Sequence, residues 1–204
     1  MDLQSPLASL MGANDAAALR VLSRSGSAFT GRQVAKLAEN GNAASIRNAL
    51  LRQVETGLVT ARSEPHATYY TANREHLLWP AIEVALDARL TLEHHITDFA
   101  TQHGIAGMTL ALYGSVARGD SRPDSDIDLL VVFPDDVPRG ERDNFITNLG
   151  DNVRQWTGND PQVYDLTHDQ LRQQTAREDP IVASWKAEAI TLVGPAIQEL
   201  SGRP

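Results

Sequence analysis

Two short apolar runs separated by a glycine turn constrain the fold of this chain more than any other feature. Residues 108–113 form the first run and end at Gly114, and residues 127–133 form the second and end at Pro134. Apolar runs of this length between turn residues are typical of buried β-strands rather than helices. The stretch therefore predicts a strand, a glycine turn, a short helix, an acidic loop and a second strand.

Two aspartates stand at the start of the second predicted strand. Successive side chains of a strand point to opposite faces, so Asp126 and Asp128 share one face while Ile127 and Leu129 share the other. Neighbouring carboxylates repel each other unless a cation lies between them, and Mg²⁺ prefers oxygen ligands. The pair predicts a metal site; the alternative is a solvated acidic loop that runs into a strand.

The turn after the first strand predicts a contact with phosphate. Gly114 lets the backbone approach a ligand closely, amide groups at the start of the following helix favour an anion, and Ser115 adds a hydroxyl. A Gly-Ser pair alone is only a turn. Together with the two aspartates downstream, it predicts a phosphate-binding corner that faces a metal site.

These residues resemble a known family. The motifs Gly-Ser-x-x-Arg-Gly at 114–119 and Ser-Asp-Ile-Asp-Leu at 125–129 are similar to the signature of the DNA polymerase β-like nucleotidyltransferase superfamily, in particular its minimal bacterial branch. The resemblance implies a third carboxylate on a later strand of the same sheet. Asp165, inside the strand-like run 162–166, is the candidate, and a capping role at a strand end is the alternative.

The resemblance also implies a reaction, in which the enzyme transfers a nucleoside monophosphate from a nucleoside triphosphate to a hydroxyl acceptor. Two Mg²⁺ ions, or Mn²⁺ in their place, would be bound by Asp126, Asp128 and Asp165. In this interpretation Asp165 also takes the proton of the acceptor hydroxyl.

The nucleotide itself is expected to contact four residues: Gly114, Ser115, Arg118 and Ser125. Arg118 follows the Gly-Ser turn, where the family has a basic residue, and would neutralise the leaving pyrophosphate. An equally open alternative for Arg118 is a surface salt bridge to Asp120 or Asp124.

The first third of the chain carries a different pattern, three helical segments followed by a β-hairpin. Helices are expected at 16–23, 30–38 and 45–55, and the hairpin strands at 58–62 and 68–71. This order resembles the winged helix-turn-helix domain of bacterial regulators, which implies DNA binding. Winged helices also mediate protein contacts, and that alternative stays open.

The helix that begins near Ala43 would be the recognition helix in this resemblance. Six polar residues are expected to face DNA, the last of them on the wing: Asn42, Ser45, Arg47, Asn48, Arg52 and Arg62. Arginine and asparagine are the side chains that read guanine and adenine edges in the major groove. The alternative is an ordinary solvated helix face.

The chain as a whole is expected to be an α+β protein in three parts. These are a winged helix-turn-helix domain at 14–75, a linker helix at 76–104 and a nucleotidyltransferase domain with a small mixed sheet at 105–204. Pro80 either starts a helix at its first turn or kinks one continuous helix.

Composition and charge narrow the classes of function. The chain has no cysteine, which excludes disulfides and thiolate metal sites, and no apolar run approaches the roughly 20 residues of a membrane span, so a cytoplasmic location is expected. The net charge is −8, yet residues 1–75 carry eight basic against six acidic residues, a balance of +2. The remaining ten basic and twenty acidic residues give −10. The positive excess in residues 1–75 would favour binding to a polyanion, and the negative excess in the rest of the chain would favour binding of cations.

Three functions remain open on the sequence alone. The first is a nucleotidyltransferase coupled to a DNA-binding domain, and the adjacent carboxylates favour it because an inert domain has no chemical reason to keep them. The second is a DNA-binding regulator whose second domain senses a nucleotide or dimerises without turnover. The third is one half of a toxin-antitoxin pair, because minimal nucleotidyltransferases occur in such pairs and a winged helix could act as an antitoxin-type repressor of the operon. A homodimer and a separate helical partner protein are expected as partners.

Overall fold

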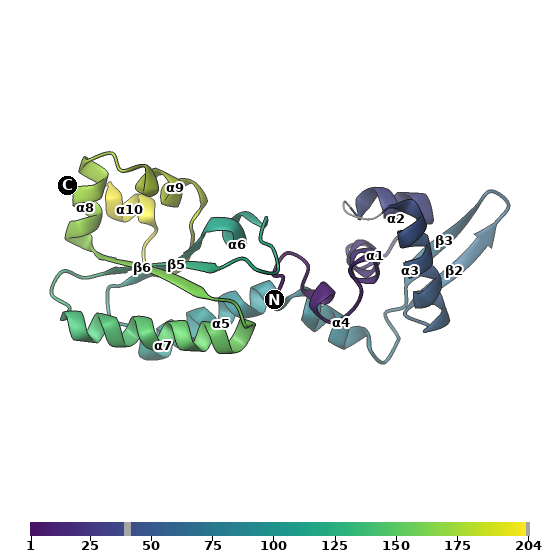
Figure 1. Ribbon diagram of the computed structural model, residues 1–204, viewed down its shortest axis with the longest axis horizontal. Coiled ribbons are helices and arrows are strands. Elements are labelled where there is room, and N and C mark those ends of the chain that lie inside the picture. Colours follow the sequence, from purple (N-terminus) through teal and green to yellow (C-terminus); the bar gives the residue numbers. More distant parts are fainter. Residues whose placement is uncertain (39–41, 203–204) are drawn as a thin grey trace. The chain divides into compact units, whose positions relative to one another are not determined.

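The computed structural model describes residues 1–38 and 42–202 (Figure 1). The chain divides into two compact units, one formed by Ser5–Ala88 and the other by Met1–Gln4 together with the chain from Arg89 onward. Each unit has its own hydrophobic core. Helices and two small sheets make up the fold, as the expected α+β class requires.

The first unit combines helices with a three-stranded antiparallel sheet of order β1-β3-β2. Its helices are η1 (Pro6–Ser9), α1 (Ala13–Ser23), α2 (Gly31–Leu37), α3 (Ala43–Glu55) and α4 (Trp79–Leu86). Its strands are β1 (Phe29–Thr30), β2 (Val59–Glu64) and β3 (Ala67–Ala72). The three helices and the hairpin that the sequence predicts for this region are therefore present.

Local sequence explains where two of these helices begin. Thr30 accepts a hydrogen bond from the backbone N–H of Gln33, whose side chain accepts one from the backbone N–H of Thr30 at 2.7 Å, so α2 starts with a capping box. The side chain of Asn42 accepts from the backbone N–H of Ser45 at 2.8 Å and caps α3.

The segment 76–104 does not form the expected single linker helix. It contains two helices, α4 and α5 (Ala88–His103), and Pro80 occupies the first turn of α4, where its missing N–H is not needed. Trp79 of α4 is buried in the first unit, whereas Ile96 of α5 is buried in the second. Each helix therefore belongs to the core of a different unit.

The second unit is built on a four-stranded mixed sheet of order β6-β5-β4-β7. The strands are β4 (Thr109–Tyr113), β5 (Ile127–Phe133), β6 (Pro161–Thr167) and β7 (Ile190–Val193). Strand β4 pairs antiparallel with both β5 and β7, while β5 and β6 are parallel. The helices of this unit, besides α5, are α6 (Gly114–Arg118), α7 (Arg139–Thr157), α8 (His168–Ala176), α9 (Pro180–Glu188) and α10 (Ile197–Ser201).

Helices cover both faces of this sheet (Figure 1). Helices α5 and α7 pack on the face that carries Ile127, Leu129 and Val131, whereas α8, α9 and α10 pack on the face that carries Leu130 and Val132. Alternate residues of β5 thus enter two separate cores, which is why the strand is a nearly continuous apolar run. In the described parts of the chain, no helix combines the length and the apolar character needed to cross a lipid bilayer.

Candidate functional site

The strand register places one polar residue from each of three neighbouring strands in a row. Tyr113 of β4 pairs with Asp128 of β5, and Asp128 pairs with Gln162 of β6. Asp128 lies on the same face as Leu130, toward α8, α9 and α10. Its side chain is half-buried, while Asp126, just before the strand, is exposed. The two predicted acidic residues therefore lie at the end of β5 that adjoins the glycine turn.

The backbone of Gly114 lies directly against the carboxylate of Asp128. Gly114 has a φ of +70°, and a Cβ atom built on it would lie 2.1 Å from Oδ2 of Asp128. Only glycine fits both the left-handed backbone and this close approach. The predicted proximity of the glycine turn and the aspartates is thus a feature of the structure.

The electrostatics of Asp128 show that it lacks a neutralising partner. Its pKa is raised above the ordinary value first by burial and then by the negative charge of Asp126, and Arg118 only partly offsets these effects. Burial and the charge of Asp128 also raise the pKa of Tyr113. Within the described residues, no hydrogen-bond donor contacts the carboxylate of Asp126 or of Asp128. These oxygen donors fit a hard divalent cation such as Mg²⁺.

The structure does not bring Asp165 together with this pair, and its expected role as a third metal ligand is wrong for this geometry. Asp165 pairs in register with Val131 and lies on the face covered by α7, opposite to the face of Asp128. Its Oδ2 atom is 3.8 Å from Nη1 of Arg142, whose side chain is only 17% exposed. Across the described residues, no three acidic or histidine side chains come close enough to hold a metal ion.

A different acid, Glu188, reaches the glycine turn from the last residue of α9. Its Oε2 atom accepts a hydrogen bond from Nη1 of Arg118 at 2.6 Å, and its Oε1 atom accepts one from the hydroxyl of Ser184 at 2.7 Å. The backbone N–H of Gly114 makes a smaller contribution that also lowers the pKa of Glu188. The hydrogen bonds from Arg118 and then Ser184 hold the pKa of Glu188 below its ordinary value. Sequence reasoning missed Glu188, because no motif marks it.

The helix that carries Glu188 is anchored one turn earlier by a tryptophan. Trp185 is fully buried and packs edge-on against Tyr113 of β4 and Tyr164 of β6, with ring centroids 6.1 and 5.0 Å apart. These aromatic contacts place the end of α9 beside the row of Tyr113, Asp128 and Gln162.

Arg118 and Ser125 make contacts that the sequence left open. Nε of Arg118 is 3.3 Å from Oδ2 of Asp120, so the expected alternative of a salt bridge with Asp120 exists alongside the shorter pair with Glu188. The hydroxyl of Ser125 accepts from the backbone N–H of Arg122 at 2.8 Å and closes the acidic loop. Ser115 lies in the first turn of α6, next to Gly114.

The residues expected to face DNA fall into two groups. Arg52 is paired with Asp15 of α1 at 2.6 Å, and Arg62 with Glu64 of its own strand at 2.8 Å. Asn42 and Ser45 are joined by the cap of α3. In contrast, Arg47 and Asn48 are exposed, and no described residue pairs with either side chain. Arg47 also borders a hollow of about 390 Å³ together with Arg32, Thr68 and Tyr70.

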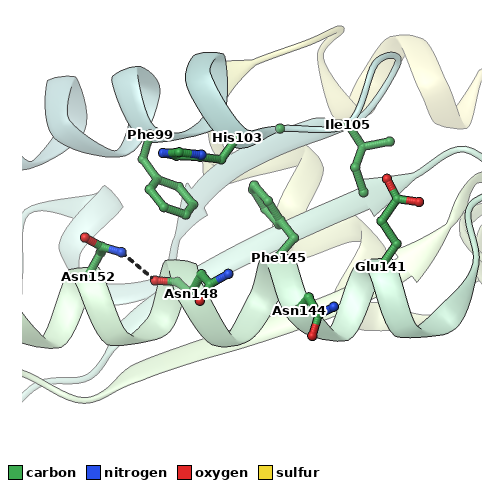
Figure 2. Close-up of a pocket in the computed structure, with 9 residues that line it drawn as sticks. Phe99, His103, Ile105, Glu141, Asn144, Phe145, Asn148 and Asn152 are labelled. Atoms are coloured by element: carbon green, nitrogen blue, oxygen red, sulfur yellow. Dashed lines mark hydrogen bonds between the residues drawn. The ribbon is translucent and has the colours of Figure 1, made fainter.

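A second hollow, of about 470 Å³, lies between α5 and α7 (Figure 2). Phe99 and His103 of α5 face Phe145 of α7, and three asparagines follow one side of α7: Asn144, Asn148 and Asn152. These helices cover the sheet face opposite to Asp128, so this hollow is separate from the acidic pair.

Comparison with known proteins identifies the domain that holds the site. Residues 92–183 match the family model described as "Nucleotidyltransferase domain", a range that includes the glycine turn and both aspartates. The match confirms the enzyme class that the sequence predicts. A comparison with curated proteins found no match.

Two solved structures are similar to part of the chain. One is a crystal structure of a toxin-antitoxin with AMP-PNP, 19% identical, covering 53% of this chain and 80% of that chain with a TM-score of 0.39. The other is a crystal structure of a mutant of the toxin-antitoxin MntA-HpeT, 18% identical, with the same coverage and a TM-score of 0.38.

Proposed function

We propose, on the premise of the nucleotidyltransferase domain at residues 92–183, that this protein is a metal-dependent enzyme that transfers a nucleoside monophosphate from a nucleoside triphosphate to a hydroxyl acceptor. The observation that carries the proposal is the half-buried, unpaired carboxylate of Asp128, which lies beside Asp126 and against the backbone of Gly114. Such an arrangement is costly in a folded protein unless a cation binds there.

Asp126 and Asp128 are the residues that would hold the metal, with Mg²⁺ as the expected ion and Mn²⁺ as its substitute. When bound, divalent cations in such sites neutralise the charge that develops on a transferred phosphoryl group, and two ions are common. Asp165 has no part in this proposal, because its carboxylate lies on the other face of the sheet and is paired with Arg142.

Gly114, Ser115, Arg118 and Ser125 form the phosphate-binding corner. These residues would bind and orient the phosphates. The absence of a Cβ at Gly114 allows close approach of the backbone. Arg118 carries the positive charge of the corner and can donate to two phosphate oxygens at once. Ser115 adds a hydroxyl, and Ser125 holds the acidic loop in place.

The first unit is proposed to be a winged helix-turn-helix domain that binds DNA as a homodimer. The order of its helices and its hairpin, the excess of positive charge in residues 1–75, and the exposed, unpaired Arg47 and Asn48 on α3 support this role. A regulator or antitoxin-type repressor that binds nucleotide without turnover is the second candidate. A separate partner protein would suit that role.

Binding of a nucleotide tests the proposed function without knowledge of the acceptor. Wild-type protein is titrated with non-hydrolysable analogues of the four nucleoside triphosphates in a calorimeter, with Mg²⁺ and then with excess EDTA. We expect binding with Mg²⁺ that EDTA abolishes. Transfer of label from α-labelled nucleotides to a cell extract then separates the enzyme from the nucleotide-sensing regulator. Absence of binding to any of the four nucleotides would contradict both.

A further inference from the structure

The carboxylate of Glu188 occupies the same hydrogen-bond donors that a phosphate would need. Nη1 of Arg118 donates to it at 2.6 Å, and the backbone N–H of Gly114 interacts with it more weakly. The hydroxyl of Ser184 completes the set at 2.7 Å. Carboxylate and phosphate oxygens accept hydrogen bonds from the same kinds of donor, so the corner is shaped for an anion, and the chain supplies one itself.

The local balance of charge makes this contact matter for ligand binding. Arg118 is paired with Glu188 and with Asp120, so its charge is already neutralised. Asp126 and Asp128 add two further negative charges next to Gly114. An arriving triphosphate would meet an excess of negative charge as long as Glu188 keeps its place.

A role for Glu188 as a third metal ligand is the competing explanation, and the geometry disfavours it. Both of its oxygens are used, Oε2 by Arg118 and Oε1 by Ser184. In addition, Glu188 and the two aspartates do not form a metal-holding group of three among the residues that the structure describes. The two explanations also predict opposite results when the charge of Glu188 is removed. Nucleotide binding would weaken if Glu188 were a metal ligand and strengthen if it competes with phosphate.

We propose that Glu188 sets the affinity of the site for its nucleotide, because its carboxylate competes with the phosphates for Arg118 beside the glycine turn. The proposal rests on the proposed function in that it assigns this corner to the phosphates. Binding then requires the side chain of Glu188 to turn away, which releases the guanidinium of Arg118 to the ligand. Glu188 is an affinity-determining residue in this scheme, with no role in bond making or breaking.

The test compares wild type with Glu188→Gln, which keeps the shape of the side chain but removes its charge. Both proteins are titrated by calorimetry with a non-hydrolysable ATP analogue in Mg²⁺ and, separately, with inorganic tripolyphosphate. We expect the variant to bind both ligands more tightly, by about tenfold, which corresponds to roughly 1.4 kcal/mol. Glu199→Gln on α10, an exposed glutamate outside the site, is the matched control and should bind as wild type does.

A second variant keeps the inference testable if Glu188→Gln does not fold. Ser184→Ala removes only the hydroxyl that holds Oε1 of Glu188, and we expect a smaller gain in affinity in the same direction. Unchanged or weaker binding of both ligands by the folded variants would overturn the inference, and weaker binding would indicate a metal ligand instead.

The two ligands separate failure of this inference from failure of the proposed function. If neither wild type nor variant binds an analogue of any of the four nucleoside triphosphates but Glu188→Gln binds tripolyphosphate more tightly than wild type, the competition stands and nucleotide transfer is wrong. If wild type binds the analogue and the variants bind it no more tightly, nucleotide transfer stands and the competition is wrong. If no protein binds either ligand, both are wrong.

Discussion

The two faces of the sheet in the second unit hold the same kind of residue in two different states. On one face Asp128 is half-buried and forms an ion pair with no described residue, and its pKa is raised by burial and by Asp126. On the other face Asp165 is paired with Arg142 of α7. A partly buried acidic side chain without a neutralising partner indicates a ligand-binding site, whereas an acidic side chain in an ion pair has a structural role.

The strongest test of the difference between the two faces is to neutralise Asp128 and Asp165 in turn and to measure nucleotide binding in Mg²⁺. We expect Asp128→Asn to weaken binding on the order of 100-fold, or about 2.7 kcal/mol, and Asp165→Asn to leave it unchanged. Asp124→Asn, an exposed acid in the same loop, is the control. Equal loss for Asp128→Asn and Asp165→Asn would show that the two faces do not differ in function.

The next largest effect is expected at the glycine that touches Asp128. Gly114→Ala places a methyl group against Oδ2 of Asp128 and forces a non-glycine residue into a left-handed backbone. We expect a loss of about 2–3 kcal/mol in the free energy of unfolding together with loss of nucleotide binding. Chemical denaturation measures the first, and Gly140→Ala, at an open helix position, is the control. A fully stable Gly114→Ala protein would show that the close approach is unimportant.

The contrast between paired and unpaired side chains extends to the first unit. Arg47 is exposed and pairs with no residue that the structure describes, whereas Arg52 on the same helix is paired with Asp15. We expect Arg47→Ala to weaken binding to a random-sequence DNA duplex by about tenfold and to reduce the salt dependence, and Arg52→Ala to have a smaller effect. Fluorescence anisotropy at several salt concentrations measures both. Absence of duplex binding by the wild type would contradict the DNA-binding role.

The smallest effect is expected on the free energy of unfolding when Asp165, the aspartate that is paired with Arg142, is replaced. Asp165→Asn removes a pair whose acidic side chain is 39% exposed, and such pairs contribute little because solvent screens them. We expect a loss below about 1 kcal/mol in the free energy of unfolding. A loss of several kcal/mol would mean that Arg142 depends on Asp165 as a buried charge does on its only partner.

Local features explain which parts of this site the sequence can predict. The apolar runs of β4 and β5, the glycine between them and the two aspartates all lie within one short stretch, so alternation of side chains places them correctly. Asp165 is predicted wrongly because its face depends on the parallel register between β5 and β6, and a shift by one residue would reverse it. The sequence does not encode that register locally.

Glu188 shows the other limit of sequence reasoning. Its place beside Gly114 depends on how Trp185 packs against tyrosines of two different strands, which is a property of the whole fold. The partners of the basic residues in the first unit follow the same logic, since Asp15 and Arg52 come from different helices. Long-range packing decides which charged side chains are available to a ligand.

The burial of Trp185 has a consequence for how the protein responds to its substrate. Because the indole of Trp185 packs against both Tyr113 and Tyr164, α9 is held to the sheet, and we expect ligand binding to move the side chain of Glu188 rather than the helix. We therefore expect occupancy of the corner to alter side-chain rotamers and surface potential while the backbone stays where it is. Intrinsic tryptophan emission would then report ligand entry without any domain closure.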